Sequence, residues 1–314
     1  MSKQRKISLI GAGNIGGELA AQIARTQLAS EVVLFDIPVK EEFAKGKALD
    51  LEQNGAINCH DCRIIGSSNW ADCAGSDVLI ITAGIPRKPG QDRKDLVATN
   101  LPIIRNVADN AKEHCPGALV IVISNPLDAM VYEFQRRTEW PRERVVGMAG
   151  VLDSARFRLF LARQANASVK DVRAMVLGGH GDTMVPVMSA CTINGIAATE
   201  FMSAEQLDAI IARTRKGGGE IVGLMGTSAY YAPASSAVSM AAAYLNDEKR
   251  ILPCAALLQG EYGYEGFFMG VPCIIGAGGM EKVVEISLND DEKTMLETSA
   301  NAVKGIVDIV NATT

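Results

Sequence analysis

The chain is 314 residues long, enough for one large domain or two of ordinary size, and we favour two. Hydrophobic residues make up 48% of the chain and charged residues 21%, which predicts an ordinary soluble globular protein. The formal net charge is −5, and the sequence has no polybasic run or basic amphipathic helix. These features argue against nucleic acid or a membrane surface as a partner.

The amino-terminal segment and the cysteines predict a cytoplasmic protein. The basic segment 1–6 leads into an apolar run that two glycines break, and no small-residue cleavage site follows, so we interpret the run as a strand and not as a signal peptide. No apolar run approaches the roughly 20 residues that cross a bilayer. The seven cysteines are scattered and odd in number, as expected of reduced thiols. Cys59 and Cys62 are spaced like half of a zinc site, but no second pair accompanies them, so we expect no metal.

The first predicted elements are a strand, a glycine turn and a helix. Residues 6–10 are aliphatic, residues 11–16 read G-A-G-N-I-G, and helix-forming residues follow. This is the context that the dinucleotide-binding fingerprint requires. Gly11 would permit the tight turn, Gly13 would let a pyrophosphate approach the backbone, and Gly16 would let the helix pack closely on the strand. The free N–H groups of the helix N-terminus would bind the phosphates.

A second strand, residues 31–36, ends on Asp36, at a distance from Gly16 that suits the ribose of a dinucleotide. A carboxylate there accepts hydrogen bonds from ribose hydroxyls, and its charge repels a 2′-phosphate. Ile37 and Pro38 follow, so no adjacent arginine neutralises such a phosphate. The sequence therefore predicts NAD in preference to NADP. The alternative for Asp36 is a helix cap or a turn residue at the end of a strand.

Strands and helices alternate through the rest of the first half. Further strands are predicted at 62–66, 78–82 and 118–124, and helices at 41–53 and 100–113. Such alternation implies parallel strands joined by right-handed crossovers, with apolar strands covered on both faces. The predicted fold class is therefore α/β, a Rossmann-type doubly wound parallel sheet followed by a C-terminal α+β substrate domain.

Ligands of such a sheet bind at the carboxyl ends of its strands. Two of these ends, residues 82–84 and 124–126, are polar or glycine-containing turns that could contact the cofactor. Between residues 84 and 99 we expect a loop that carries Arg87 and Arg93 among four cationic residues. One interpretation of this loop is a solvated charge run, and the other is a lid that traps an anion beside the cofactor.

The regular alternation fades after a short predicted strand at 145–147. We therefore divide the chain into an NAD-binding domain, residues 1–146, and a catalytic domain that binds the substrate, residues 147–314. Later in the chain we predict a helix within 202–224 that ends at the glycine-rich residues 216–220, another helical segment, antiparallel strands at 251–259, 266–271 and 283–288, and a closing helix at 290–310.

A lone histidine lies among glycines in V-L-G-G-H-G-D-T-M-V-P, residues 176–186. The apolar run 172–177 predicts a strand, so His180 would lie at its end and face a cleft, where imidazole suits proton transfer near neutral pH. The alternative is a histidine in a surface turn. A helix predicted at 150–166 carries Asp153 and Arg156 on one face. These two form either a surface ion pair or, if they face the cleft, a partner for the imidazole and an anchor for a carboxylate.

Taken in order, these motifs closely resemble the lactate/malate dehydrogenase family, and within it the malate dehydrogenases of the lactate-dehydrogenase-like branch. The motifs that carry the resemblance are G-A-G-N-I-G, Asp36, G-I-P-R-K-P-G-Q-D-R, S-N-P-L-D, D-S-A-R and G-G-H-G-D-T-M-V-P. The resemblance runs from residue 6 to beyond residue 290.

The resemblance implies a role for each matching residue. His180 would be the acid/base and Asp153 its partner. Substrate contacts would come from Arg156 as the carboxylate anchor, Arg93 as the residue that polarises the reacting carbonyl, and Asn125 as a positioning group. The implied cofactor contacts are Gly11, Gly13, Asn14, Ile15, Gly16, Asp36, Thr82, Ala83, Gly84, Asn100, Ile123 and Asn125.

Arg87 falls where members of this family choose their substrate. Malate dehydrogenases carry arginine there, whereas lactate dehydrogenases carry a neutral side chain, typically glutamine. The resemblance therefore implies reversible hydride transfer between (S)-malate and NAD⁺, a reaction of the tricarboxylic acid cycle, by a homotetramer or dimer. The alternatives are an L-lactate or other 2-hydroxy acid dehydrogenase and, more distantly, a dinucleotide-binding regulator without catalysis.

Overall fold

The computed structural model describes residues 4–86 and 93–313, with the side chain of Arg93 excepted. Nine of the strands form one sheet, in the order β14-β13-β12-β6-β5-β4-β1-β2-β3. Six of them run parallel: β1 (Lys6–Ile10), β2 (Glu31–Phe35), β3 (Arg63–Ser67), β4 (Val78–Ile81), β5 (Leu119–Val122) and β6 (Val145–Gly147). Their spatial order is that of a doubly wound Rossmann sheet, so the predicted fold class of the first half is confirmed.

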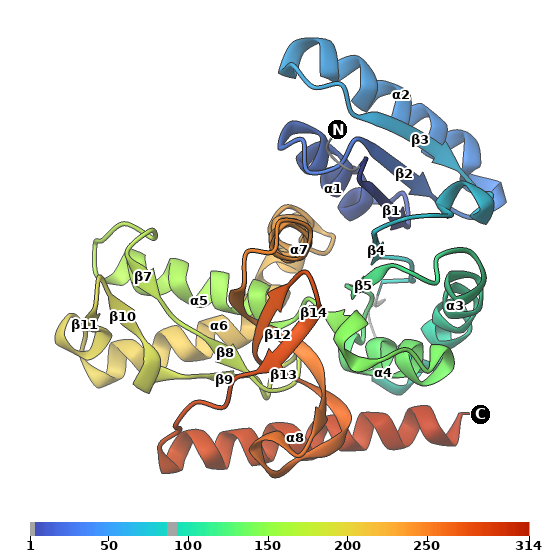
Figure 1. The fold of residues 1–314 in the computed structure, drawn as a ribbon. Coiled ribbons are helices and arrows are strands. Elements are labelled where there is room, and N and C mark those ends of the chain that lie inside the picture. The colour runs from blue at the N-terminus through green and yellow to red at the C-terminus, as the bar shows by residue number, and fades with distance from the viewer. Residues whose placement is uncertain (1–3, 87–92, 314) are drawn as a thin grey trace.

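Helices cover both faces of this parallel sheet (Figure 1). The crossovers are α1 (Asn14–Arg25), α2 (Glu41–Asn58), α3 (Arg93–His114) and α4 (Leu127–Thr138). On β1, Ile7 and Leu9 pack into the core formed with α1, whereas Ile10 packs into the core formed with α3 and α4. Since successive strand residues point to opposite faces, the all-apolar strands fill both cores at once.

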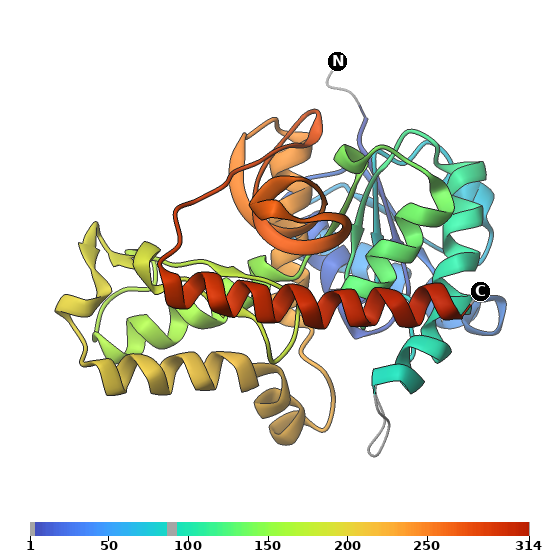
Figure 2. The same cartoon turned by 90° about the horizontal axis from the view of Figure 1, so that it is seen from below.

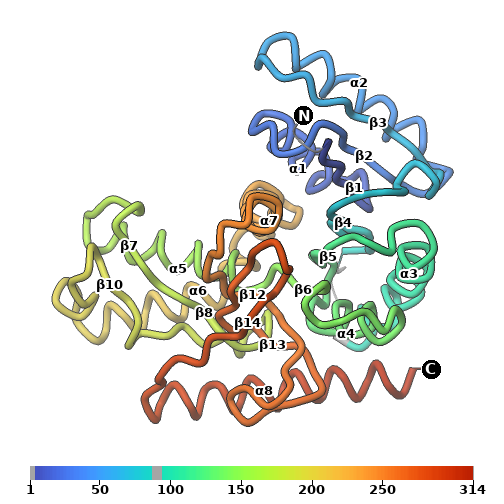
Figure 3. Tube along the Cα trace, viewed as in Figure 1, coloured from blue at the N-terminus to red at the C-terminus, as the bar shows by residue number. Residues whose placement is uncertain are grey.

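The second half extends the same sheet in antiparallel fashion. The strands β12 (Arg250–Gln259), β13 (Glu265–Gly276) and β14 (Gly279–Val283) form a meander, and β12 pairs with β6 at Ala255 and Gly147. The tube in Figure 3 shows this meander beside β6. The antiparallel pairing that the sequence predicts is therefore confirmed.

The other elements of the second half lie around this meander. The helices are α5 (Gly150–Gln164), α6 (Ala204–Met225), α7 (Tyr231–Leu245) and α8 (Asp290–Ala312), and the short strands are β7 (Val172–Arg173), β8 (Val176–Leu177), β9 (Val185–Pro186), β10 (Thr192–Ile193) and β11 (Ile196–Ala197). Helix α7 contacts α1 and α5 and lies between the two halves. Helix α8 runs along one side of the molecule and ends beside α3 and α4 (Figure 2). No helix in the described part of the chain is long and apolar enough to cross a membrane.

Two predicted strands are wrong. The single strand expected at 172–177 is two short strands in different sheets, because β7 pairs with β10 while β8 pairs with β9. A strand is also expected at 283–288, but β14 ends at Val283, the first residue of that range. Beyond it the amide of Ile286 donates to the hydroxyl of Tyr262 instead of to a neighbouring strand, which holds this alternating segment in an irregular conformation.

The limits of two predicted helices and the loop before one of them are also corrected. Helix α3 begins at Arg93, so residues 93–99 form its first turns and are not loop. Helix α6 runs unbroken through the glycines at 217–219, where we expected it to end. Two of these glycines, Gly217 and Gly218, lie near Arg156 at the candidate active site.

Candidate active site

A cavity of about 1170 Å³ runs along the carboxyl ends of the parallel strands, from Asp36 after β2 to His180 in the second half. Every predicted cofactor residue except Gly16 lines it. Residues 227–230, which precede α7, line it as well. The sheet therefore brings together most of the positions that the sequence singles out, at the edge where parallel α/β sheets bind ligands.

The three glycines of the first turn meet three different steric demands. Gly11 has a φ of +118°, and a Cβ there would lie 2.5 Å from the Thr82 hydroxyl oxygen. A Cβ on Gly16 would overlap the carbonyl oxygen of Gly11, which explains its close packing and its absence from the cavity wall. Around Gly13, no heavy atom of the described residues lies within 4 Å of the Cβ position. The backbone is therefore open to a phosphate group at Gly13.

Two side chains of opposite charge hold this turn. Asp36 accepts a hydrogen bond from the amide of Ala12 at 2.9 Å. The ammonium of Lys47, on α2, donates to the carbonyls of Ala12 at 3.0 Å and Gly13 at 2.8 Å. Burial lowers the pKa of Lys47, opposed by the charge of Asp36. Lys47 binds carbonyl groups and not amides, and no side chain caps the N-terminus of α1. The first amides of α1 therefore stay available to an anion.

Asn100 ties together the loops that follow β4 and β5. Its side-chain amide accepts from the amide of Ile85 at 2.8 Å and donates to the carbonyl of Asn125 at 2.7 Å. The residue is buried, while Asn125 is exposed at the cavity. Asn100 therefore sets the relative position of two loops whose residues line the cavity.

At the end of the cavity, Asp153 bridges an imidazole and a guanidinium. Its Oδ2 lies 2.7 Å from Nδ1 of His180, and its Oδ1 accepts from Nη1 of Arg156 at 3.0 Å. The side chains of Asp153, Arg156 and His180 are 2%, 13% and 15% exposed, so the surface ion pair that the sequence left open is excluded. A carboxylate on Nδ1 favours the tautomer that leaves Nε2 free.

The surroundings of His180 favour the protonated imidazole. Burial alone would lower its pKa, but the charge of Asp153, the hydrogen bond to Asp153 and the charge of Asp128 outweigh burial and Arg156, so the pKa of His180 is raised above its ordinary value. A group in this state binds a proton more readily than a free histidine does, which suits an acid/base near neutral pH.

A second cavity, of about 800 Å³, opens beside the first, and Arg156 and His180 line it together with residues of α6. A Cβ on Gly217 would lie 3.1 Å from Cδ of Arg156, and one on Gly218 would lie 3.8 Å from its Nη2. The Nε of Arg156 is buried without a hydrogen-bond partner among the described residues. Gly217 and Gly218 thus let α6 pass close to the guanidinium of Arg156.

The remaining residues to place are two arginines, two cysteines and two residues that the sequence did not single out. Arg87 lies outside the described residues, and so does the side chain of Arg93. The cysteines Cys59 and Cys62 are free thiols, one exposed and one buried. Lys47 and Asp128 were not singled out as site residues, because each acts on a segment far away in sequence and neither has a local signal beyond the motif S-N-P-L-D that contains Asp128.

Two family models and a curated relative match this chain over nearly its whole length. Residues 5–147 match the family model described as lactate/malate dehydrogenase, NAD binding domain, and residues 150–314 match its alpha/beta C-terminal domain. The chain is 74% identical over 312 residues to a malate dehydrogenase of Sorangium cellulosum, covering 99% of each protein.

Solved structures of both enzyme types superpose closely. Malate dehydrogenase from Cryptosporidium parvum is 45% identical, with a TM-score of 0.95 over 98% of this chain and 99% of that one. Lactate dehydrogenase from the same organism, complexed with lactic acid and nicotinamide adenine dinucleotide, is 43% identical, with a TM-score of 0.95 over 99% of each chain. With both domains matched in order, the chain belongs to the lactate/malate dehydrogenase family.

Proposed function

We propose that this chain is an NAD-dependent malate dehydrogenase, which interconverts (S)-malate and oxaloacetate. The single observation that carries the chemistry is the buried group of His180, Asp153 and Arg156 at the end of the dinucleotide cavity. The curated relatives named malate dehydrogenase support malate as the substrate, among them one that is 74% identical.

The described residues fit NAD along the cavity. The open backbone at Gly13 and the uncapped N-terminus of α1 suit its pyrophosphate. Asp36 suits the ribose hydroxyls beside them, and its charge disfavours a 2′-phosphate. When bound, NAD⁺ supplies the hydride acceptor for malate oxidation and NADH the hydride donor for the reverse reaction.

His180 moves the proton. In malate oxidation its Nε2 accepts the proton of the C2 hydroxyl, and in the reverse direction it returns that proton to the carbonyl oxygen. Asp153 holds Nδ1–H and stabilises the imidazolium that forms, without itself taking the proton. Arg156, fixed by the same carboxylate, binds the carboxylate next to the reacting carbon with its planar fork.

The remaining substrate contacts come from the loops. We assign Asn125, at the cavity, as a positioning group and Arg93 as the residue that polarises the reacting carbonyl. Arg87 would pair with the distal carboxylate, which malate has and lactate lacks. The alternative is an L-lactate dehydrogenase. The fold does not discriminate between the two substrates, because a lactate dehydrogenase and a malate dehydrogenase both superpose with a TM-score of 0.95.

We further propose a division at residues 146 and 147, a cytoplasmic location and a homo-oligomer, either tetramer or dimer. The free state of all seven cysteines fits a reducing compartment. Large apolar side chains on and before α2 are exposed to solvent, including Val39, Phe43, Leu49 and Ile57. Such side chains suit a surface that a second subunit covers.

A substrate panel tests the proposed function. Purified protein with NADH should consume oxaloacetate with a kcat/KM roughly 10²–10⁴ times that for pyruvate, the preference that one additional charge-assisted carboxylate contact supports. NADH binding without turnover of any 2-oxo acid would identify a regulator, and a preference for pyruvate would identify a lactate dehydrogenase.

A further inference from the structure

The backbone of the catalytic turn is held by side chains from two distant helices. The amide of Gly179 donates to the hydroxyl of Ser299, on α8, at 2.9 Å. The next amide, that of His180, donates to Oδ2 of Asp128, on α4, at 3.0 Å. Gly178, just before them, forms a two-way backbone bridge with Gly270 on β13. The position of the imidazole therefore depends on groups outside its own turn.

Ser299 and Asp128, which bind the amides of Gly179 and His180, form a clamp on this turn. Asp128 is its charged member. It is 4% exposed and lies in the first turn of α4, where the free amides of a helix N-terminus favour an anion. It also lines the cofactor cavity, three residues after Asn125. One carboxylate thus joins the loop at the cofactor to the turn that carries the acid/base.

Among the described residues, the charges around His180 come from four elements. From α5 it faces Asp153 and Arg156, and from α4 it faces Asp128. His180 also lines the second cavity, together with Arg213, Arg215, Lys216 and Glu220 of α6 and Asp182 of its own turn. The side chain that α8 contributes, Ser299, is uncharged. Asp128 is thus a second negative charge near His180, after that of Asp153. It raises the pKa of His180, whereas the positive charge of Arg156 lowers it.

Building on the proposed function, we propose that Asp128 is a positioning residue for the acid/base: its carboxylate fixes the backbone of His180 and, with Asp153, favours the imidazolium. The structure does not place it in contact with the proton that is transferred.

Titration of His180 by NMR tests this directly, because the chain has only three histidines and so only three imidazole groups to assign. Asp128→Asn and Asp128→Ser both remove the charge, and either one that folds suffices. We expect the midpoint of His180 to fall by about one pH unit in the protein without ligands, the usual size of the effect of one nearby charge.

Kinetics provide the second readout. Oxaloacetate reduction needs the imidazolium, so kcat/KM is lost as pH rises through the pKa of His180. In the Asp128 variants this falling limb should move to lower pH by the same amount as the NMR midpoint. The rising limb of malate oxidation, which needs neutral imidazole, should move with it.

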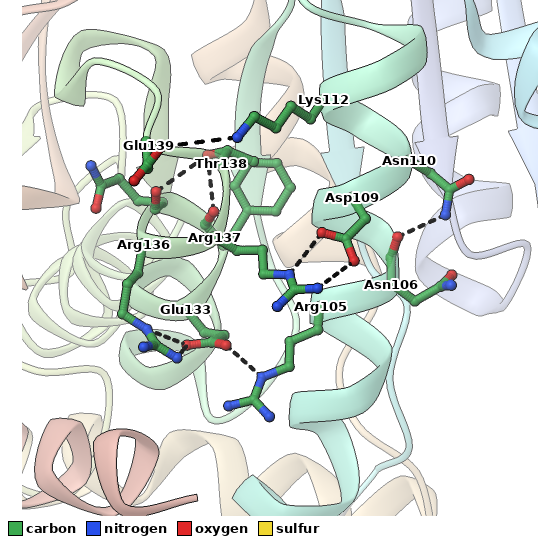
Figure 4. Close-up of polar contacts among 12 residues, drawn as sticks. Arg105, Asn106, Asp109, Asn110, Lys112, Glu133, Arg136, Arg137, Thr138 and Glu139 are labelled. Atoms are coloured by element: carbon green, nitrogen blue, oxygen red, sulfur yellow. Dashed lines mark hydrogen bonds and ion pairs between the residues drawn. The ribbon is translucent and has the colours of Figure 1, made fainter. Parts of the chain in front are cut away.

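Two further variants separate charge from structure. Glu133→Gln removes another buried carboxylate from α4, one that pairs with Arg105 and Arg136 away from the cavity (Figure 4). It should lower the melting temperature and leave the midpoint of His180 in place. Ser299→Ala loosens the clamp without removing a charge, so it should lower kcat several-fold at an unchanged midpoint.

The inference and the proposed function fail separately. A His180 midpoint within about 0.2 units of wild type in the folded Asp128 variants, or an equal fall in Glu133→Gln, overturns the role of Asp128. A wild-type protein that does not reduce oxaloacetate overturns the proposed function, and the NMR titration still decides whether Asp128 acts on the imidazole.

Discussion

Gly217 lies against Arg156: a Cβ on this glycine would be 3.1 Å from Cδ of the arginine. Gly217 is the first of three consecutive glycines inside α6, a helix of 22 residues. Each of them costs helix stability relative to alanine. At Gly217 the absence of a side chain leaves room for the guanidinium of Arg156, which we propose as the carboxylate anchor.

Gly217→Val should therefore impair substrate binding. The branched side chain crowds the stem of Arg156 and shifts its fork, and we expect KM for oxaloacetate to rise by about tenfold or more, at the scale of 1–3 kcal/mol for overpacking. NADH binding, measured by fluorescence, should stay near wild type. An unchanged KM would mean that Arg156 does not bind the substrate in this position.

Gly223→Ala, on the same helix and outside both cavities, is the matched control. Gly223 is exposed, and no described heavy atom lies within 4 Å of its Cβ position. The substitution should raise the free energy of unfolding by about 0.5–1 kcal/mol and leave the kinetics unchanged. Urea titration and steady-state rates check both.

His180→Asn should remove the proton transfer and keep the cofactor site. We expect kcat to fall by about 10²–10⁴, the usual contribution of an acid/base, with NADH affinity nearly unchanged because the phosphate and ribose contacts lie elsewhere. Turnover within about tenfold of wild type would assign the proton transfer to another group.

The raised pKa of His180 predicts a pH-dependent stability. Burial opposes the shift, but Asp153 and Asp128 outweigh it, so the folded protein holds the proton more tightly than the unfolded chain does. The resulting stabilisation is complete below the unfolded pKa of about 6.5 and is lost as pH rises through the folded pKa. Asp153→Asn should weaken this stabilisation.

Urea unfolding at a series of pH values measures the effect. The difference in unfolding free energy between wild type and Asp153→Asn should be largest in mildly acidic solution and should shrink as pH rises through the folded pKa. A difference that grows with pH would have the opposite sign and would contradict a raised pKa at His180.

Lys47→Met should loosen the glycine turn. Hydrogen bonds from a charged donor contribute about 1.5–3 kcal/mol each, and losing two that only orient the loop should weaken NADH binding by roughly tenfold. Lys45→Met, on the same helix but paired with Glu41 and Glu42 at the surface, is the control and should bind NADH normally. Equal affinities of the two variants would remove Lys47 from the cofactor site.

The parts of the fold that follow from local pattern could be predicted from the sequence. Apolar runs predict the parallel strands, the spacing of Gly11, Gly13 and Gly16 predicts the first turn, and a histidine among glycines after an apolar run predicts a residue at a cleft. Each of these features depends on neighbours within a few positions, where steric rules are strong.

The contacts that join distant segments could not be predicted in this way. Lys47 reaches the carbonyl of Ala12 across 35 positions, and Asp128 reaches the amide of His180 across 52. Local propensity also misjudged α6, because glycine has a low helix propensity whereas the packing of this helix against α5 keeps it unbroken. Tertiary contacts decide these features, and a single sequence does not display them.

The proposed substrate carries a second carboxylate, and the ratio of kcat/KM for oxaloacetate to that for pyruvate tests this most directly. Arg87, which the sequence predicts to meet that carboxylate, lies outside the described residues, so kinetics must decide. The wild-type ratio should be about 10²–10⁴, and Arg87→Gln should lower it strongly by weakening oxaloacetate and relieving an unpaired charge against pyruvate. A wild-type ratio near one, or a ratio that stays within about threefold after Arg87→Gln, would contradict the account.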